Sequence, residues 1–358
     1  MMPIHPRPNP IVAAMYTLRD MDADVIVMHG PAGCGFMASR MLEEAGVRIV
    51  TTGMKENDLV FGAAERLERT LRTVSEKFAP RTVAVVGTCA SMIIGEDIGA
   101  AIRRANIGCT VFQVDCHGCM ENNISGAVRA IDAGCAAGLL PREEAERQKR
   151  LMRAAAEMDV RYGMAGKEYL SPVRGPTKMK VAETVVNALR SGKKVAAVMI
   201  AKKELAYRFA DILLAVNEAA DALGGNVRSI ANIDRNAGLP RIRRYADDIT
   251  RELASKGVIV DEVIGGLDEY AAVGGMMKEA VDRYGPDLLV IAGIPHAYPY
   301  SAGDVLITDQ PRQLAKYLAE GCSLAVGEIS SHSMVMNTRH IIGSETGDTI
   351  REMIGGGQ

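Results

Sequence analysis

Several features are scarce or missing in this 358-residue sequence, and each absence excludes a class of protein. There is no tryptophan and only five phenylalanines, so few large aromatic side chains are available to stack on nucleic-acid bases. The 42 basic and 44 acidic residues nearly cancel, which argues against a general nucleic-acid binder. No apolar run reaches the roughly 18 residues that span a bilayer. The first residues lack the basic flank and apolar stretch of a secretory signal, and we therefore expect a cytoplasmic protein.

A disulfide framework is also not expected. In a reducing compartment and a chain of this length, cysteines serve as core residues, metal ligands or redox groups. A second Cys-x-x-Cys pair, which would complete a four-thiolate zinc site, does not occur in the sequence. The seven cysteines are Cys34, Cys89, Cys109, Cys116, Cys119, Cys135 and Cys322. We expect Cys109, Cys135 and Cys322 to be core residues.

Short apolar runs alternate with helical patterns along most of the chain. Such alternation predicts an α/β protein whose parallel sheets are covered on both faces. We expect two Rossmann-like domains, at residues 1–140 and 193–358, joined by a charged helical connector at 141–192. The expected strands are 24–30, 47–53, 82–88 and 110–115 in the first domain and 194–201, 227–232, 257–265, 287–293 and 323–328 in the second.

Four of the cysteines follow predicted strands. Cys34 follows the first strand, Cys89 the third, and the pair Cys116/Cys119 the fourth. Open parallel sheets bind ligands outside the carboxyl ends of their strands, and neighbouring strands are about 4.8 Å apart. Thiols on neighbouring strand ends can therefore reach one small object. This placement predicts an iron–sulfur cluster in the N-terminal half.

The segment HGPAGCGFMASR (29–40) resembles a phosphate-binding loop but lacks its lysine, because Phe36 stands at that position. We therefore expect no ATP binding of the P-loop kind. Gly33 and Gly35, with Gly87 after the third strand, would instead let the backbone approach a bulky ligand beside Cys34. A tight turn around a buried cysteine is the alternative.

The other two cysteine segments also leave alternatives open. Cys89 lies at a strand-to-helix turn, where amide groups favour a thiolate. A structural cysteine would also be unremarkable there, but the position level with Cys34 favours a ligand. Cys116 and Cys119 could form a redox dithiol, half of a metal site, or a pair beside a cluster. His117 lies inside the pair, so the segment is not a haem-attachment signature.

Three titratable side chains follow predicted strands. His296 follows the strand at 287–293, and Asp115 and His117 follow the strand at 110–115. The segment 235–244 is rich in arginine, and a solvated helix face is the simpler interpretation of that segment.

These segments together resemble the catalytic-component subunits of nitrogenase and its relatives. HGPAGCG matches the family's first cysteine turn, VVGTCASMIIGEDI (85–98) its second cysteine segment, and VDCHGC (114–119) the place of a further cysteine. TTGMKENDLVFGAAERL (51–67) and PDLLVIAGIP (286–295) resemble two more of its segments. The agreement is best over residues 25–120. The short chain and the segments around Cys34 and Cys116 most resemble the branch that reduces a nickel tetrapyrrole.

The resemblance implies a specific reaction system. It implies a catalytic subunit that holds one [4Fe–4S] cluster per homodimer, with Cys34 and Cys89 of both chains as ligands and Cys116 or Cys119 as further candidates. A nitrogenase-reductase-like ATPase, carrying its own [4Fe–4S] cluster, would supply the electrons. The substrate would be a nickel tetrapyrrole, reduced with lactam closure to form the nickel coenzyme (factor 430) of methyl-coenzyme M reductase. Ring reduction adds protons as well as electrons, so a general acid should face the substrate, and His296, Asp115 and His117 are the candidates by position. Arginines in the segment 235–244 could bind the substrate carboxylates.

Three other interpretations remain open at this stage. Within the family, the chain could reduce another tetrapyrrole or act as a scaffold for cofactor assembly. In a different class, it could be a non-catalytic module that binds a tetrapyrrole or metal and has no cluster.

Overall fold

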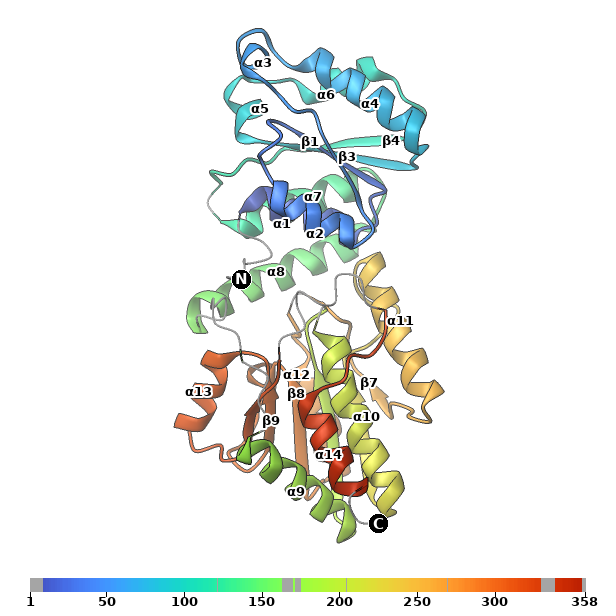
Figure 1. Cartoon of the computed structure of the whole chain (residues 1–358), viewed down its shortest axis with the longest axis vertical. Helices are drawn as coiled ribbons and strands as arrows, with labels where there is room; N and C mark the ends of the chain where they lie inside the picture. Colours follow the sequence, from blue (N-terminus) through green and yellow to red (C-terminus); the bar gives the residue numbers. More distant parts are fainter. Residues whose placement is uncertain are drawn as a thin grey trace. The chain divides into compact units, whose positions relative to one another are not determined.

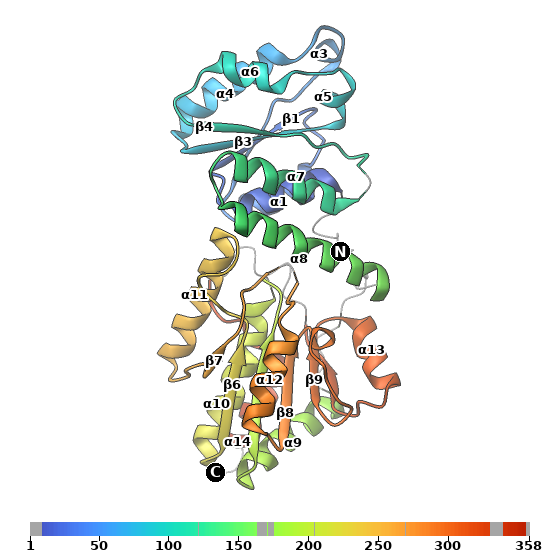
Figure 2. The same cartoon turned by 180° about the vertical axis from the view of Figure 1, so that it is seen from behind.

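The computed structural model describes residues 9–120, 122–162, 170, 175–203, 205–268, 270–329 and 339–355. The chain divides into two compact units, each built on a parallel β-sheet with helices packed on it (Figures 1 and 2). Unit 1 comprises Met1–Arg153 with Leu239–Arg241, and unit 2 comprises Ala154–Gly238 with Ile242–Gln358. The α/β class with two parallel-sheet domains is therefore confirmed. Among the described residues, no helix is long and apolar enough to cross a membrane.

The sheet of unit 1 has four strands in the order β2-β1-β3-β4, and every pairing is parallel. Its strands are β1 Val25–His29, β2 Arg48–Thr51, β3 Thr82–Gly87 and β4 Thr110–Val114. The central strands β1 and β3 are buried along nearly their whole length, because helices cover both faces. Parallel pairing places the carboxyl ends of all four strands at one edge.

The helices of unit 1 lie on both sides of this sheet (Figure 1). They are α1 Pro10–Asp20, α2 Phe36–Glu44, α3 Glu56–Phe61, α4 Ala64–Phe78, α5 Cys89–Ile93, α6 Ile98–Ala105 and α7 Asn123–Ala136. On one face, α4 and α6 bury Leu67, Leu71 and Ala101 against valines of β1 and β3. On the other face, α1 and α7 pack tightly against each other, as the carbonyl of Pro10 next to Gly126 shows.

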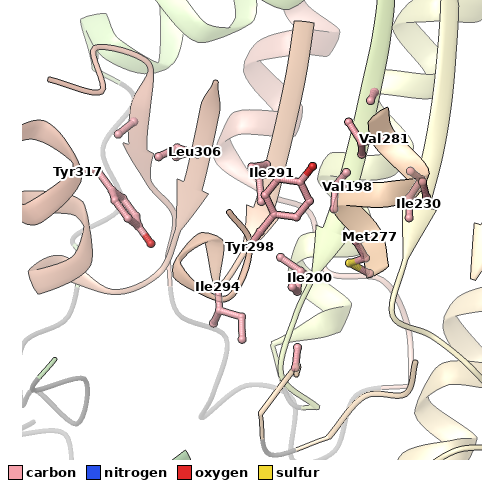
Figure 3. Close-up of a cluster of buried hydrophobic side chains, with 14 of the residues drawn as sticks. Val198, Ile200, Ile230, Met277, Val281, Ile291, Ile294, Tyr298, Leu306 and Tyr317 are labelled. Atoms are coloured by element: carbon pink, nitrogen blue, oxygen red, sulfur yellow. The ribbon is translucent and has the colours of Figure 1, made fainter. Parts of the chain in front are cut away.

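The sheet of unit 2 has six parallel strands in the order β10-β9-β8-β5-β6-β7. Its strands are β5 Lys194–Ile200, β6 Asn226–Ala231, β7 Glu262–Val263, β8 Leu288–Gly293, β9 Val305–Thr308 and β10 Ala325–Gly327. The β5 and β8 strands form the buried centre of the sheet. Figure 3 shows the core on one of its faces, where Val198, Ile200 and Ile291 meet Met277 and Val281 of a neighbouring helix.

The remaining helices connect and cover the strands of unit 2. They are α8 Arg142–Tyr162, α9 Pro176–Arg190, α10 Ala206–Leu223, α11 Pro240–Ser255, α12 Gly274–Tyr284, the short 3-10 helix η1 Pro295–Ala297, α13 Pro311–Ala319 and α14 Glu345–Gly355. The division between the two units falls within α8. Helix α9, which the sequence places in the connector, packs with α10 and α14 in unit 2.

Candidate functional site

The four cysteines that the sequence singles out lie together at the carboxyl ends of the unit 1 strands. We call this group, Cys34, Cys89, Cys116 and Cys119, the cysteine edge. Cys34 follows β1, Cys89 is the first residue of α5 after β3, and the other two follow β4. Because the strand order is β2-β1-β3-β4, Cys89 lies between Cys34 on one side and the Cys116/Cys119 loop on the other.

The cysteine edge coincides with the point where the chain changes direction across the sheet. From β1 the chain passes to β2 on one side and then to β3 and β4 on the other. Ligands of open parallel sheets bind at this switch point, outside the carboxyl ends of the two strands concerned. Cys34 and Cys89 follow β1 and β3, which are those two strands.

Close backbone packing shapes the turn that carries Cys34. A Cβ atom on Gly30 would lie 2.3 Å from Oγ1 of Thr88, so only glycine fits there. Gly35 adopts a φ of 96°, a left-handed conformation that glycine tolerates, and α2 begins directly after it. The N–H of Cys34 donates to the carbonyl of Pro31 at 3.0 Å and closes the turn.

The three glycines predicted to border a cofactor have different roles in the structure. Gly35 serves the turn, and a Cβ on Gly87 would lie 3.1 Å from the carbonyl of Cys116. Gly33 alone of the three has open space where a Cβ would stand. It is therefore the position at which a ligand could approach the backbone, and the cofactor role of all three remains a prediction.

Thr88 fixes the start of α5 and links the two central strands. Its hydroxyl donates to the carbonyl of His29 at 2.9 Å, and its N–H donates to Oγ of Ser91 at 2.8 Å. The helix itself spans only Cys89–Ile93, so its amides are a weak source of stabilisation for a thiolate. The N–H of Gly118 instead donates to Sγ of Cys89 at 3.1 Å, and comes from the loop after β4.

The thiols of the cysteine edge are close enough to influence one another. Partial burial, and next the charge of Cys89, raise the pKa of Cys34. The pKa of Cys119 is raised by its side-chain hydrogen bond to Cys89. The raised pKa values mean that Cys34 and Cys119 hold their protons more tightly than free thiols, whereas a bound metal centre would favour the thiolates and release those protons.

Cys116 differs from the other three because it is buried. Burial, and next the charge of Asp115, raise its pKa to about 12, and its sulfur lies 3.7 Å from that of Met120. It is therefore a thiol at neutral pH. Cys119, two residues beyond His117, is exposed and is the more accessible of the pair.

No complete metal-binding set is formed by the described residues of this one chain. No three His, Cys, Asp or Glu side chains among them are arranged to hold a metal ion. The donor chemistry nevertheless suits an iron–sulfur cluster, which thiolates hold and backbone N–H groups tune. Cys89 accepts a hydrogen bond from the N–H of Gly118, and Cys34 is partly exposed, so both sulfurs suit the ligation of such a cluster.

The candidate proton donors divide between the two units. Asp115 and His117 belong to the loop of the cysteine edge, where Asp115 is exposed and 3.5 Å from Arg129. Nδ1 of His117 is buried and has no hydrogen-bond partner among the described residues. His296 lies in η1 of unit 2, where burial, followed by Lys202 and Lys316, lowers its pKa to about 3.

Two features of this region were not recognised in the sequence. The first is a buried polar group: Nδ1 of His29 lies 3.2 Å from Oγ1 of Thr52, and its Nε2 lies 3.9 Å from Glu96. The second is a set of exposed apolar side chains following the ends of β1, β2 and β3: Phe36, Val60, Phe61 and Ile93, which are 67%, 75%, 86% and 76% exposed. Each of these residues stands beside another apolar residue in the sequence, a pattern that predicts burial, so the sequence does not reveal that they are exposed.

The arginine-rich segment is only partly a solvated helix face, because Arg241 is partly buried and donates to the carbonyl of Ala45, and its role in carboxylate binding stays a prediction. Arg235 lies 3.3 Å from Asp247, and α11 buries Ile242, Ile249 and Leu253 on one face. Of the three cysteines expected in the core, Cys322 is buried in the core of unit 2. Cys109 and Cys135 are only partly buried.

Comparison with known proteins adds to this geometry. The model of the nitrogenase component 1 type oxidoreductase family matches residues 10–152. Three similar proteins are components CfbD of the Ni-sirohydrochlorin a,c-diamide reductive cyclase complex. The chain is 44% identical to that of Methanosarcina acetivorans (98% of this chain, 97% of the relative), 42% to that of Methanothermobacter thermautotrophicus (98% and 99%) and 36% to that of Methanocaldococcus jannaschii (98% and 99%).

Proposed function

We propose that this chain, which belongs to the CfbD family of nitrogenase component 1 type oxidoreductases, is the catalytic subunit of a Ni-sirohydrochlorin a,c-diamide reductive cyclase complex. It would reduce the nickel tetrapyrrole with closure of a lactam ring, on the route to the nickel coenzyme of methyl-coenzyme M reductase. The observation that carries the proposal is the position of Cys34 and Cys89 on neighbouring strand ends at the switch point of the first sheet.

A [4Fe–4S] cluster held by Cys34 and Cys89 is the cofactor that we assign to the cysteine edge. Such a cluster supplies single electrons at low potential and is held by four thiolates. The N–H donated by Gly118 would stabilise the thiolate of Cys89 and support its ligation. Cys119 is the next candidate because it is exposed, while the buried Cys116 would first have to lose a tightly held proton.

A homodimer would complete this ligand set. Two cysteines from each of two chains give four thiolates around a twofold axis. The exposed Phe36, Val60, Phe61 and Ile93 support this arrangement. Phe36 and Ile93 follow β1 and β3, as the two cysteines do, and Val60 and Phe61 follow the neighbouring strand β2. Apolar surface of this kind is characteristic of a site that another protein covers.

Protons would come from groups beside the substrate. Asp115 and His117 share the loop of the cysteine edge and could donate as acids. With a pKa of about 3, His296 is neutral at physiological pH and is poorly suited to give up a proton as an imidazolium ion. As a neutral imidazole it can still donate a hydrogen bond and orient a substrate.

ATP would be hydrolysed by a partner rather than by this chain. Phe36 opens α2 where a phosphate loop carries its lysine. We therefore propose a nitrogenase-reductase-like ATPase, carrying its own [4Fe–4S] cluster, as the electron donor. Seven free thiols are compatible with a reducing compartment, which supports a cytoplasmic location.

The decisive experiment compares cysteine variants of the anaerobically purified protein. Cys34→Ser and Cys89→Ser should each lose most of their iron and the broad visible absorption that dithionite bleaches. Cys322→Ser, at a buried core position, should keep both. Only the wild type and Cys322→Ser should reduce nickel sirohydrochlorin a,c-diamide with the ATPase partner. Normal iron in both edge variants, or a colourless wild type, would contradict the proposal and favour a binding module without a cluster.

A further inference from the structure

The second sheet has its own switch point, and it also carries functional side chains. From β5 the chain passes to β6 and β7 on one side and then to β8, β9 and β10 on the other. The neighbouring strands β5 and β8 are therefore the place where ligands of an open parallel sheet are expected. Lys202 follows β5 and His296 follows β8.

The backbones of these two strand ends are in direct contact. The N–H of Ile294 donates to the carbonyl of Ile200 at 2.8 Å. Gly293 has a φ of 121°, and a Cβ there would lie 2.2 Å from the same carbonyl oxygen, so the approach depends on glycine. Lys202 and His296 each stand two residues beyond this contact and therefore begin from adjoining backbone.

A buried side chain from the next strand holds this strand end in place. Oδ1 of Asn232, which follows β6, accepts the N–H of Ala201 at 2.9 Å. Its Nδ2 donates to the carbonyls of Ala201 at 2.8 Å and Gly266 at 3.1 Å. Because Asn232 is fully buried, these bonds fix the backbone immediately before Lys202. The backbone that carries Lys202 is therefore held rigidly.

Two positive charges act on the imidazole of His296. Lys202 is one of them, and the other is Lys316 on α13, which begins after β9 on the far side of β8. The imidazole itself is neutral because burial, the largest cause, and these two charges lower its pKa to about 3. A neutral imidazole beside two ammonium groups offers hydrogen bonding without cancelling their attraction for an anion.

Helix α13 adds polar groups on its buried face. Gln313 and Tyr317 are one helical turn apart and both buried, whereas Arg312 and Leu318 are exposed. Tyr317 is adjacent to the backbone of His296, and Figure 3 shows its hydroxyl directed toward the carboxyl ends of the strands. Gln313 is 1% exposed, and its Oε1 has no hydrogen-bond partner among the described residues.

A buried acceptor without a donor is costly, and a ligand N–H would satisfy it. Lys316 keeps Glu320 at 3.6 Å, but an ion pair of that spacing on a half-exposed helix contributes little and can be exchanged for a ligand. The group formed by Lys202, His296, Gln313 and Lys316, which we call the β5–β8 edge, therefore combines two cations with an unused acceptor. That combination suits a molecule bearing both carboxylates and amide N–H groups.

We propose that the β5–β8 edge binds the peripheral side chains of the tetrapyrrole: Lys202 and Lys316 its carboxylates, and Gln313 an amide N–H. This inference rests on the proposed function, because the reductive cyclase substrate is a diamide of a polycarboxylate. Recognition of this kind distinguishes the diamide from the fully carboxylated precursor. The neutral imidazole of His296 would then orient the bound side chains.

Binding can be followed by the absorbance change of the tetrapyrrole on titration with the holoprotein. The probes are sirohydrochlorin a,c-diamide with free carboxylates, the same macrocycle fully esterified, and tricarballylate, a polycarboxylate without the ring, as a competitor. We expect Lys202→Met and Lys316→Met each to weaken binding of the free acid about tenfold or more, as loss of a charged hydrogen bond does. Binding of the ester should not change, and Lys202→Arg should restore most of the affinity.

Lys194→Met is the matched control, because Lys194 begins β5 at the opposite edge of the same sheet. It should bind like the wild type, and equal iron content in all variants shows that they fold. If the wild type binds the free acid but neither Met variant weakens it, the inference is overturned and the proposed function stands. If tricarballylate competes as strongly as the macrocycle binds, the edge is a general anion site and the inference fails. If the wild type binds no tetrapyrrole, the proposed function itself is overturned.

Discussion

Two histidines at strand ends are buried deeply enough to remain neutral. Burial, opposed in part by the charge of Asp58, lowers the pKa of His29 to about 4 from 6.5. His29 is fully buried at the end of β1, so protonating it would place a charge in the core of unit 1 that nearby carboxylates offset only in part. The folded state therefore binds this proton less readily than the unfolded chain does.

This difference makes the stability of the protein dependent on pH. The lowered pKa means that the stabilisation is fully present above about 6.5 and is progressively lost as the pH falls toward about 4. The expected loss attributable to His29 is about 3 kcal/mol, as an order of magnitude. Urea unfolding at several pH values between these limits should give a flatter dependence for His29→Asn than for the wild type. His340→Gln, at an exposed position, should leave the wild-type slope unchanged, and an equal slope in all three proteins would contradict the prediction.

A single residue also determines the expected response to ATP. Phe36 is 67% exposed at the start of α2, in the position that a phosphate loop gives to lysine. The isolated protein should therefore neither bind nor hydrolyse ATP, because no ammonium group is available there for the β- and γ-phosphates. Equilibrium dialysis with labelled ATP and a phosphate-release assay without the partner test this. Hydrolysis that survives removal of every trace of partner would overturn the division into two components.

At the scale of elements, long apolar runs predict the fold well and short ones predict it poorly. The expected strands at 82–88 and 194–201 correspond closely to β3 and β5. The run 257–265 yields only the two-residue β7, since Ile259 is 80% exposed rather than buried in the sheet. Strand β9, Val305–Thr308, is not predicted, because its apolar run has only the three residues from Val305 to Ile307. Its register comes from pairing with β8 and β10, which a local pattern does not contain.

The two candidate sites also differ in how well the sequence predicts them. The cysteine edge could be predicted because each thiol follows an apolar run and thiols are rare. The role of Lys202 could not be predicted, because lysine is common and its position at a shared edge depends on the pairing of β5 with β8. Paired residues of these strands, such as Val195 and Leu288, are 93 positions apart in the sequence. Long-range strand order decides which residues share an edge, and one sequence gives no direct signal for it.

Two glycines of α7 provide a test of packing between elements. A Cβ on Gly126 would lie 1.9 Å from the backbone carbonyl of Pro10, whereas on Gly134 it would meet the flexible thioether of Met21 at 2.7 Å. Relative to glycine, alanine stabilises a helix by up to about 1 kcal/mol at either site. Gly126→Ala should nevertheless lower the free energy of unfolding by about 1–3 kcal/mol, because α1 must move away. Gly134→Ala should cost clearly less in the same urea titration, and equal effects would show that α1 and α7 are not held at this distance.

At the scale of the whole molecule, each unit places its distinctive side chains at the switch point of its own sheet. In unit 1 these are thiols, which suit electron transfer, and in unit 2 they are lysines and polar groups, which suit the side chains of a substrate. The same topological rule thus accounts for the positions of both proposed sites. In the proposed function, Cys34 and Cys89 of one chain supply only half of the cluster ligands, so the reaction would require assembly of two chains.

The last prediction joins dimer formation to iron content. If each chain offers two thiolates, a monomer cannot complete a four-cysteine cluster, and metal ligation favours the assembled state over separated chains. Iron content should therefore approach about four per dimer, and removal of the iron should loosen the dimer.

Phe61→Glu places a charge on an 86% exposed side chain of α3, beside the strand ends that carry Cys34 and Cys89. It should shift the protein toward monomers in sedimentation velocity and lower the iron content with it. Ile259→Glu, at an 80% exposed position in unit 2, should change neither. Four irons in each chain, or an iron-loaded monomer, would show that one subunit holds the whole cluster, and Cys116 and Cys119 would then supply the remaining ligands.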